Sequence, residues 1–238
     1  MPMAGVAGVV VSPEHRGRGV GTALMQGTIT RGRELGYPLS VLYPATIPVY
    51  RRQGWELARK QNRVSIEARL LRDLRGGSVD VREATADDAE TMLEIMRRQY
   101  SAARANGPKD STVDELRDEL GDDSVFAYVA ADGFVVYGWE GSDLVVYQVQ
   151  AADADTARAL WAVVGSGSSV AKRVYAYLSF DDPVHLLVSE TVAREVQQTR
   201  WMLRCLDVVP PSPAVGMPPG RRWTSHWSSW MPRCPTTA

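Results

Sequence analysis

The sequence predicts an α/β protein with an α+β mixed sheet, because strand-like and helix-like segments alternate over most of its 238 residues. Short valine-rich runs alternate with segments in which apolar residues recur at intervals of four. After Ser78 a second alternation of the same kind begins. We therefore expect two units, at residues 1–77 and 78–208, followed by an irregular or disordered tail at 209–238.

The first unit begins with a strand, a loop and a helix. Val6–Val11 is a β-branched run typical of a buried strand, and the turn-forming residues 12–19 end it. Apolar residues at intervals of four predict a helix over Val20–Leu35. Gly36 stands where a glycine commonly ends a helix.

The rest of the first unit is expected to be strand, short helix and strand. Leu39–Tyr43 is a second apolar run. A short helix fits from about Thr46, as its cap, to Gln53, with Gly54 closing it. Polar and apolar residues alternate at 63–67, as in a half-exposed strand.

The stretch Leu70–Ser78 predicts a linker, because it combines charged residues with two glycines. Beyond it, strands are expected at 79–82, 125–131, 134–139, 144–149 and 173–178, and helices after Thr85 and at 154–164. The tail at 209–238 has seven prolines and no acidic residue, and it shows neither a helical nor a strand period.

Composition narrows the class of protein. The net charge of −1 gives no electrostatic case for binding nucleic acid or an anionic membrane. Two cysteines, Cys205 and Cys234, do not suggest a disulfide scaffold. Without a long apolar run or a secretory signal, a soluble cytoplasmic protein is expected. Residues 1–60 carry eight Lys/Arg against three Asp/Glu, which suits an anionic ligand, although a solvated surface explains the bias about equally well.

The most informative motif joins the first strand to the first helix. Gly17, Gly19 and Gly21 would let backbone N–H groups approach a phosphate, and the helix N-terminus would add partial positive charge. Arg16 and Arg18 would add charge-assisted donors. The segment therefore predicts a pyrophosphate cradle; the alternative is that these glycines only shape a turn.

The spacing of Arg16, Gly19 and Gly21 after a β-branched strand resembles the signature of the GNAT acetyltransferases. The resemblance implies acetyl-CoA as acyl donor and no metal. It implies that the strand contacts the pantetheine arm and that residues 45–46 lie near the thioester. The implied cofactor-binding residues are Val9, Val10, Val11, Arg16, Gly17, Arg18, Gly19, Val20, Gly21, Thr22, Ala45 and Thr46.

A second part of the resemblance is Tyr50, followed by the pair Gly54–Trp55. In the GNAT family a tyrosine at this point protonates the departing coenzyme A thiolate. A phenol is protonated at neutral pH and can act as such an acid. The resemblance thus implies that Tyr50 is catalytic; the alternative is an ordinary aromatic residue on a short helix.

Within the superfamily the chain is most similar to the Eis-like (enhanced intracellular survival) branch, which has two tandem GNAT domains and a C-terminal sterol-carrier-like domain. This similarity rests on His15–Arg16 with the glycine loop, on Val49–Trp55, and on a second α/β region without that loop. Residues 201–208 resemble the start of the third domain. It implies tandem GNAT-like units, the first incomplete at its N-terminal side, in a chain truncated at both ends.

The implied function is an N-acetyltransferase that moves an acetyl group from acetyl-CoA to a primary amine by direct attack in a ternary complex. The acceptor would be a small molecule or a peptide, with no nucleic acid or membrane partner, and a homo-oligomer is left open. No residue is named as the base. The alternatives are a non-catalytic CoA-binding or assembly module whose acceptor site is lost by truncation, and a fragment that does not fold alone.

Overall fold

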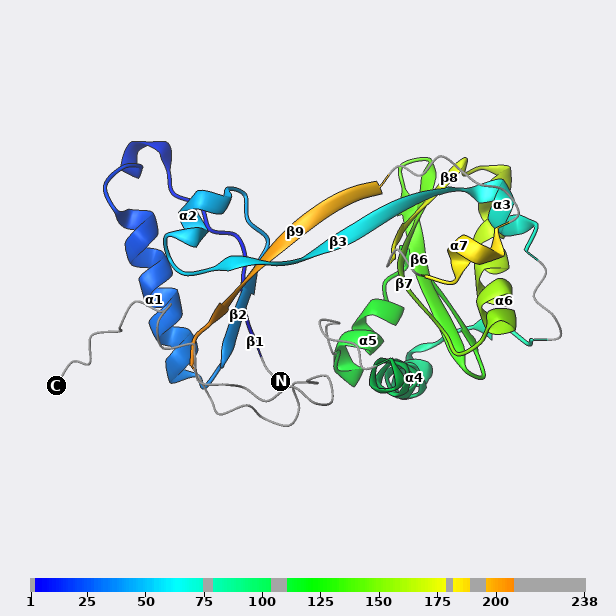
Figure 1. Cartoon of the computed structure of the whole chain (residues 1–238). Helices are drawn as coiled ribbons and strands as arrows, with labels where there is room; N and C mark the ends of the chain where they lie inside the picture. The colour runs from blue at the N-terminus through cyan, green and yellow to red at the C-terminus, as the bar shows by residue number, and fades with distance from the viewer. Residues whose placement is uncertain (1–2, 75–78, 104–110, 179–181, 189–195, 208–238) are drawn as a thin grey trace, which may run out of the picture.

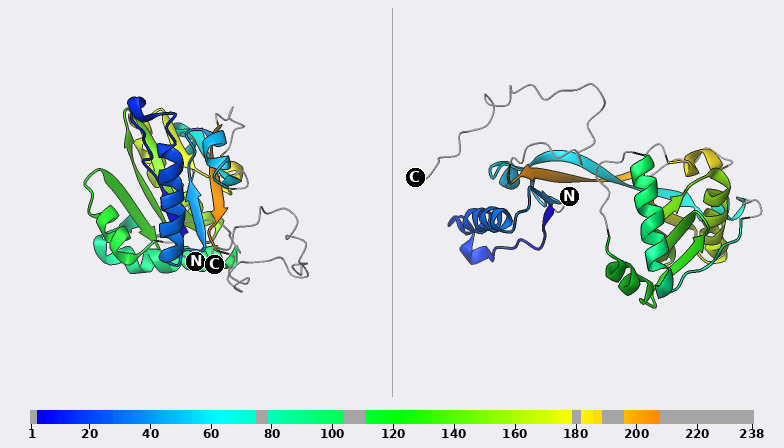
Figure 2. Two further views of the ribbon diagram at one scale, coloured as in Figure 1. Left: turned by 90° about the vertical axis from the view of Figure 1, so that its left-hand side faces the viewer. Right: turned by 90° about the horizontal axis from the view of Figure 1, so that it is seen from below.

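The computed structural model describes residues 3–74, 79–103, 111–178, 182–188 and 196–207. These residues form one nine-stranded sheet in the order β1-β2-β9-β3-β8-β7-β6-β5-β4. The pairs β1–β2 and β7–β8 are parallel, and the other neighbouring pairs are antiparallel. The predicted mixed sheet is confirmed. Two lobes lie at opposite ends of this sheet, and the long strands β3 and β9 run between them (Figures 1 and 2).

The strands are β1 (Met3–Val6), β2 (Leu39–Leu42), β3 (Glu56–Glu67), β4 (Arg82–Glu83), β5 (Val125–Ala130), β6 (Gly133–Glu140), β7 (Asp143–Ala151), β8 (Arg173–Tyr177) and β9 (Val196–Cys205). The helices are α1 (Val20–Glu34), α2 (Ile47–Arg51), α3 (Ala68–Arg72), α4 (Ala89–Ala102), α5 (Val113–Leu120), α6 (Ala154–Gly165) and α7 (Val184–Leu187). Short 3-10 turns cover Pro13–His15, Ala86–Asp88 and Ser166–Ser169.

The first lobe packs α1 and α2 on strands β1, β2, β9 and β3. Its apolar side chains form one buried cluster, which we call the first-lobe core: Met25, Ile29, Leu42, Tyr50, Trp55, Met202 and Leu206. Met202 on β9 is fully buried and pairs with Leu42 of β2 on one side and Leu57 of β3 on the other. A strand from residues predicted to belong to the second unit therefore completes the first lobe.

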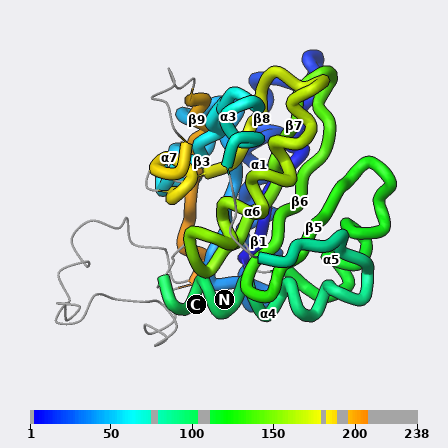
Figure 3. The backbone as a smooth tube through the Cα atoms, turned by 90° about the vertical axis from the view of Figure 1, so that its right-hand side faces the viewer, coloured from blue at the N-terminus to red at the C-terminus, as the bar shows by residue number. Residues whose placement is uncertain are grey.

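In the second lobe, helices lie on both faces of the sheet, with α4 on one side of the strands and α6 on the other (Figures 2 and 3). Val135 and Tyr137 of β6 pack in the cluster that contains residues of α3, α6 and α7. Phe134 and Val136 pack in the cluster that contains residues of α4 and α5. Because successive side chains of a strand point to opposite faces, β6 is buried on both sides and lies at the centre of this lobe.

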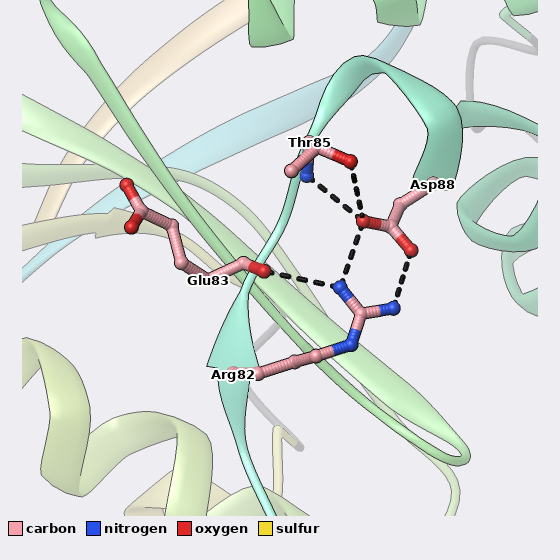
Figure 4. A network of polar contacts seen from close by, with 4 residues as sticks. All are labelled: Arg82, Glu83, Thr85 and Asp88. Carbon is pink, nitrogen blue, oxygen red and sulfur yellow. Dashed lines mark hydrogen bonds and ion pairs between the residues drawn. The ribbon is translucent and has the colours of Figure 1, made fainter.

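A polar network fixes β4 to the start of α4 (Figure 4). Both terminal nitrogens of Arg82 donate to the carboxylate of Asp88, at 2.9 and 2.6 Å. The backbone N–H of Thr85 donates to the same carboxylate at 2.8 Å, as part of a capping box. The Arg82 guanidinium and this N–H hold the pKa of the buried Asp88 well below its usual range.

Several sequence predictions are confirmed closely. Helix α1 begins at Val20 as expected, and Gly36 follows it with a φ of 74°. Helix α2 has Thr46 as its N-cap, although the Thr46 side chain makes no capping hydrogen bond. Strands β2, β5, β6, β7 and β8 and helix α6 each lie within two residues of the expected bounds.

The strand predicted over Val6–Val11 is wrong: β1 covers Met3–Val6, and the chain leaves the sheet after Val6. In the register, Val6 lies opposite Leu42, the last residue of β2, and Pro44 follows shortly after. Since proline lacks a backbone N–H, the chain after β2 cannot continue the hydrogen-bonded pairing with the valines that follow Val6. Gly8, with a φ of 66°, turns the chain away.

The linker predicted at Leu70–Ser78 is wrong over the residues that the structure describes. Leu70 and Leu71 lie in α3 and are buried, whereas 75–78 lie outside the described residues. Strand β3 begins at Glu56, seven residues before the expected start, and strand β4 lies at Arg82–Glu83 instead of 79–82.

Two segments near the end of the chain were predicted as the start of a third domain, 201–208, and as an irregular tail, 209–238. The stretch read as the start of a third domain from Trp201 is instead part of β9, up to Cys205. Val208 and the tail predicted as irregular, 209–238, lie outside the described residues.

Candidate functional site

The loop between β1 and α1 is exposed and folds back on itself. After the turn Pro13–His15, the Nε of Arg16 donates to the carbonyl oxygen of Val11 at 3.1 Å. Val11 is half-buried, and its Cγ2 lies 3.6 Å from the point where a Cβ on Gly21 would stand. Val11 therefore lies next to the first turn of α1, close to the space that a side chain at Gly21 would enter.

Two glycines of this loop need a conformation that other residues avoid. Gly17 has a φ of 75° and Gly19 a φ of 81°, and a Cβ at either position would meet nothing within 4 Å. Gly19 is the N-cap of α1, and no side chain caps that end. The first-turn N–H groups at Val20, Gly21 and Thr22 thus have no partner within the helix, which leaves an open, partially positive end suited to an anion.

Tyr50 lies beside this helix. It is 9% exposed and packs in the first-lobe core together with Met25 of α1, and half-buried Val9 packs against the same core. The amide nitrogen of Gln26 on α1 donates to the side-chain oxygen of Gln53 just after α2, at 2.6 Å. The structure therefore brings Val9, the first half of α1 and the tyrosine helix together.

Four other predicted site residues are exposed and are not part of the first-lobe core. Val10 is 80% exposed and is not part of the first-lobe core. Ala45 and Thr46 are exposed and immediately precede α2. Arg18 is exposed in the glycine loop.

Arg204, on β9, is a residue that sequence reasoning missed. The Cζ of its guanidinium lies 5.3 Å from the centroid of the Trp55 ring. A Cβ on Gly54 would overlap this guanidinium, and Gly54 has a φ of 85°. The guanidinium of Arg204 therefore fills the space beside Gly54 and lies over the ring of Trp55, in the segment that follows Tyr50. No motif or spacing in the sequence points to Arg204. The only sequence signal is the Gly54–Trp55 pair, which suggests that some side chain packs against the tryptophan ring.

The second lobe contains an equivalent strand–helix–strand arrangement, β7–α6–β8, without a glycine loop. Asp153 is the N-cap of α6, and its carboxylate accepts from the N–H of Thr156 at 2.8 Å. This N–H lowers the pKa of Asp153, so the carboxylate is charged at neutral pH. A negative side chain already occupies this helix end, and it would repel a phosphate.

Metal-ligating side chains are scattered over the part of the chain that the structure describes. Within the described ranges, no three His, Cys, Asp or Glu residues gather where they could hold an ion. His15 and His185 lie in different lobes, and His226 lies outside the described residues. Of the helices that the structure describes, none is long and apolar enough to span a bilayer.

Two parts of the chain match models of known protein families. Residues 1–58 match an acetyltransferase (GNAT) domain model, and residues 110–205 match a second acetyltransferase (GNAT) domain model. The chain belongs to the GNAT acetyltransferase superfamily. The two matches in tandem confirm the tandem GNAT-like units, and the first covers only residues 1–58.

Individual relatives agree with this assignment. The chain is 29% identical to the N-acetyltransferase Eis of Mycobacterium tuberculosis, over 87% of this chain and 56% of that protein. A GCN5-related N-acetyltransferase from Kribbella flavida is similar with a TM-score of 0.83 and 50% identity, over 86% of this chain and 52% of that one. One from Anabaena variabilis has a TM-score of 0.75 and 27% identity, over 87% and 56%.

These similarities support the Eis-like branch of the GNAT superfamily. The chain spans about half the length of the relatives that it matches.

Proposed function

We propose that this GNAT chain is an N-acetyltransferase, which moves an acetyl group from acetyl-CoA to a primary amine. The observation that carries the proposal is the uncapped N-terminus of α1, reached through Gly17 and Gly19 and packed beside the helix that bears Tyr50. A cytoplasmic location is proposed with it. The second lobe, with Asp153 at the matching helix end, would not bind a second donor.

The donor substrate would be held mainly through its phosphates. The N–H groups at Val20, Gly21 and Thr22 would donate to the pyrophosphate, and Arg16 and Arg18 would add charge-assisted donors. Open space beside both positive-φ glycines supports this fit, because any side chain there would fill the cradle. Val9–Val11 would follow the pantetheine arm, and residues 45–46 would lie near its thioester end.

The chemistry needs one bond to form and one to break. The nitrogen of a free amine attacks the thioester carbonyl, a C–N bond forms, and the C–S bond breaks. Tyr50 gives its phenolic proton to the leaving thiolate, and the acceptor nitrogen loses a proton to a base. Backbone N–H groups near the cofactor strand would polarise the carbonyl.

The alternative is a non-catalytic CoA-binding or assembly module. The same α1 terminus supports it equally, because donor binding needs only the glycine loop. The two functions differ in turnover: the transferase releases coenzyme A thiol in the presence of an amine, whereas the binding module holds the donor unchanged.

A thiol-release assay against a panel of small-molecule and peptide primary amines tests the transferase function. We expect amine-dependent release, with kcat lowered about 10²-fold in Tyr50→Phe, a loss typical of a missing general acid. Tyr147→Phe, in the exposed part of the second lobe, is the matched control and should keep wild-type kcat. Donor binding without release for any amine would favour the binding module.

A further inference from the structure

The guanidinium of Arg204 is enclosed by the segment that follows Tyr50. It stacks over the Trp55 ring and fills the space next to Gly54 in which a side chain would otherwise lie. Trp55 is fully buried, so its ring is a fixed platform. A planar cation over an indole face, held away from water, makes a favourable contact.

This contact connects directly to the backbone of the tyrosine helix. The carbonyl oxygen of Tyr50 accepts hydrogen bonds from the N–H of Gln53 at 2.9 Å and from the N–H of Trp55 at 3.2 Å. These two hydrogen bonds close the turn from Tyr50 to Trp55. A shift of the Trp55 backbone therefore acts on the Tyr50 carbonyl through the hydrogen bond between them. The left-handed Gly54 lies in the middle of this turn.

Arg204 itself is firmly placed. On β9 it lies opposite Ser40 of β2, and Met202 on the same strand and Leu206 just after it are both buried in the first-lobe core. Because β9 pairs with β2 from Met202 to Cys205, and with β3 up to Leu203, the position of residue 204 is set by the sheet and not by the α2 segment. The sheet can therefore hold the turn in one position.

We propose that Arg204 is a positioning residue for the reaction, which fixes the phenol of Tyr50 by clamping the Gly54–Trp55 turn. The proposal rests on the acid role of Tyr50 proposed above. It gives the Gly–Trp pair a physical purpose: glycine leaves room for the guanidinium, and tryptophan supplies the face on which it stacks. It also makes the first-lobe site dependent on a strand that follows the whole second lobe in sequence.

The placement of Tyr50 can be measured without turnover. Protein labelled with 3-fluorotyrosine has nine tyrosines, and the fluorine signal that disappears in Tyr50→Phe identifies residue 50. We expect this signal to shift or broaden in Arg204→Met. It should stay unchanged in Arg200→Met, which removes the same charge from an exposed position of the same strand. An unchanged Tyr50 signal in Arg204→Met overturns the proposal.

If Arg204→Met does not fold, Arg204→Lys serves instead. Lysine keeps the charge but lacks the planar fork that stacks on tryptophan. The Tyr50 signal should still move in this variant, and an unchanged signal would overturn the proposal in the same way.

Kinetics separate the positioning role from a purely structural one. We expect Arg204→Met to lower kcat about 10-fold with the KM for acetyl-CoA unchanged, since misplacing a catalytic group affects the chemical step. Adding it to Tyr50→Phe should cause no further loss, and a full additional 10-fold loss would contradict the proposal. If Tyr50→Phe alone keeps wild-type kcat, the acid role fails, while the fluorine measurement still decides whether Arg204 places Tyr50.

Discussion

The side chain of Leu206 occupies the space beside Gly32 that a larger residue would need. Its Cδ1 lies 2.6 Å from the point where a Cβ on Gly32 would stand, and both residues are buried. The Nε of Arg33 also donates to the carbonyl oxygen of Leu206 at 2.7 Å. The residue that follows β9 is thus fixed to α1, the helix that offers the donor cradle.

Substitution of Gly32 should therefore destabilise the protein, although alanine is the better helix former. We expect Gly32→Ala to lower the free energy of unfolding by about 0.5–1 kcal/mol, because the displacement of the buried Leu206 side chain outweighs the gain in helix propensity. Gly27→Ala, in the same helix with open space around it, should raise stability by up to about 1 kcal/mol. Urea unfolding of both variants checks this; equal effects would contradict the close contact.

Helix α3 packs on the end of α6 without room for a side chain. A Cβ on Gly165 would overlap the backbone of Leu71 and Arg72. We expect Gly165→Ala to cost about 1–3 kcal/mol, since backbone cannot move aside. Gly167→Ala would meet only the far end of the Leu144 side chain, so it should cost clearly less. Thermal unfolding of the pair tests this, and similar losses would argue against the α3–α6 contact.

The Arg82–Asp88 pair predicts an acid-sensitive part of the stability. The folded pKa of Asp88 lies below its unfolded value near ~4, so the contribution is complete at neutral pH and is lost as pH falls below about 4. Arg82→Met should lower the free energy of unfolding only modestly at pH 7, because the Arg82 side chain is 61% exposed and solvent screens its charge.

The difference between wild type and Arg82→Met should narrow as the pH is lowered, and denaturant unfolding at several pH values measures it. Arg98→Met, which breaks an exposed pair with Asp132, is the control and should show little pH-dependent difference. A gap between wild type and Arg82→Met that stays constant with pH would contradict the assignment.

Local signals in the sequence predicted the elements of the first lobe that have clear ends. Gly19 and Gly36 bound α1 because both positions require a positive φ, which glycine adopts without strain. Helix α5 was missed, although Thr112 and Glu115 form a capping box that would have revealed it.

Long-range pairing was not predictable in the same way. Residues 59–62 of β3 are all polar, since this part of the strand is paired with β9 but largely uncovered, and so they show no alternation. The insertion of β9 between β2 and β3, and with it the place of Arg204 at the Gly54–Trp55 turn, depends on residues far apart in sequence.

Calorimetric titration of acetyl-CoA into wild type, Gly19→Glu and Gly36→Glu tests the central claim most directly. Both glycines have a positive φ and open surroundings, but they lie at opposite ends of α1. The account predicts binding of one donor per chain to wild type and Gly36→Glu, and loss of binding in Gly19→Glu. Equal binding by both variants, or none by a folded wild-type chain, would contradict a donor site at the start of α1.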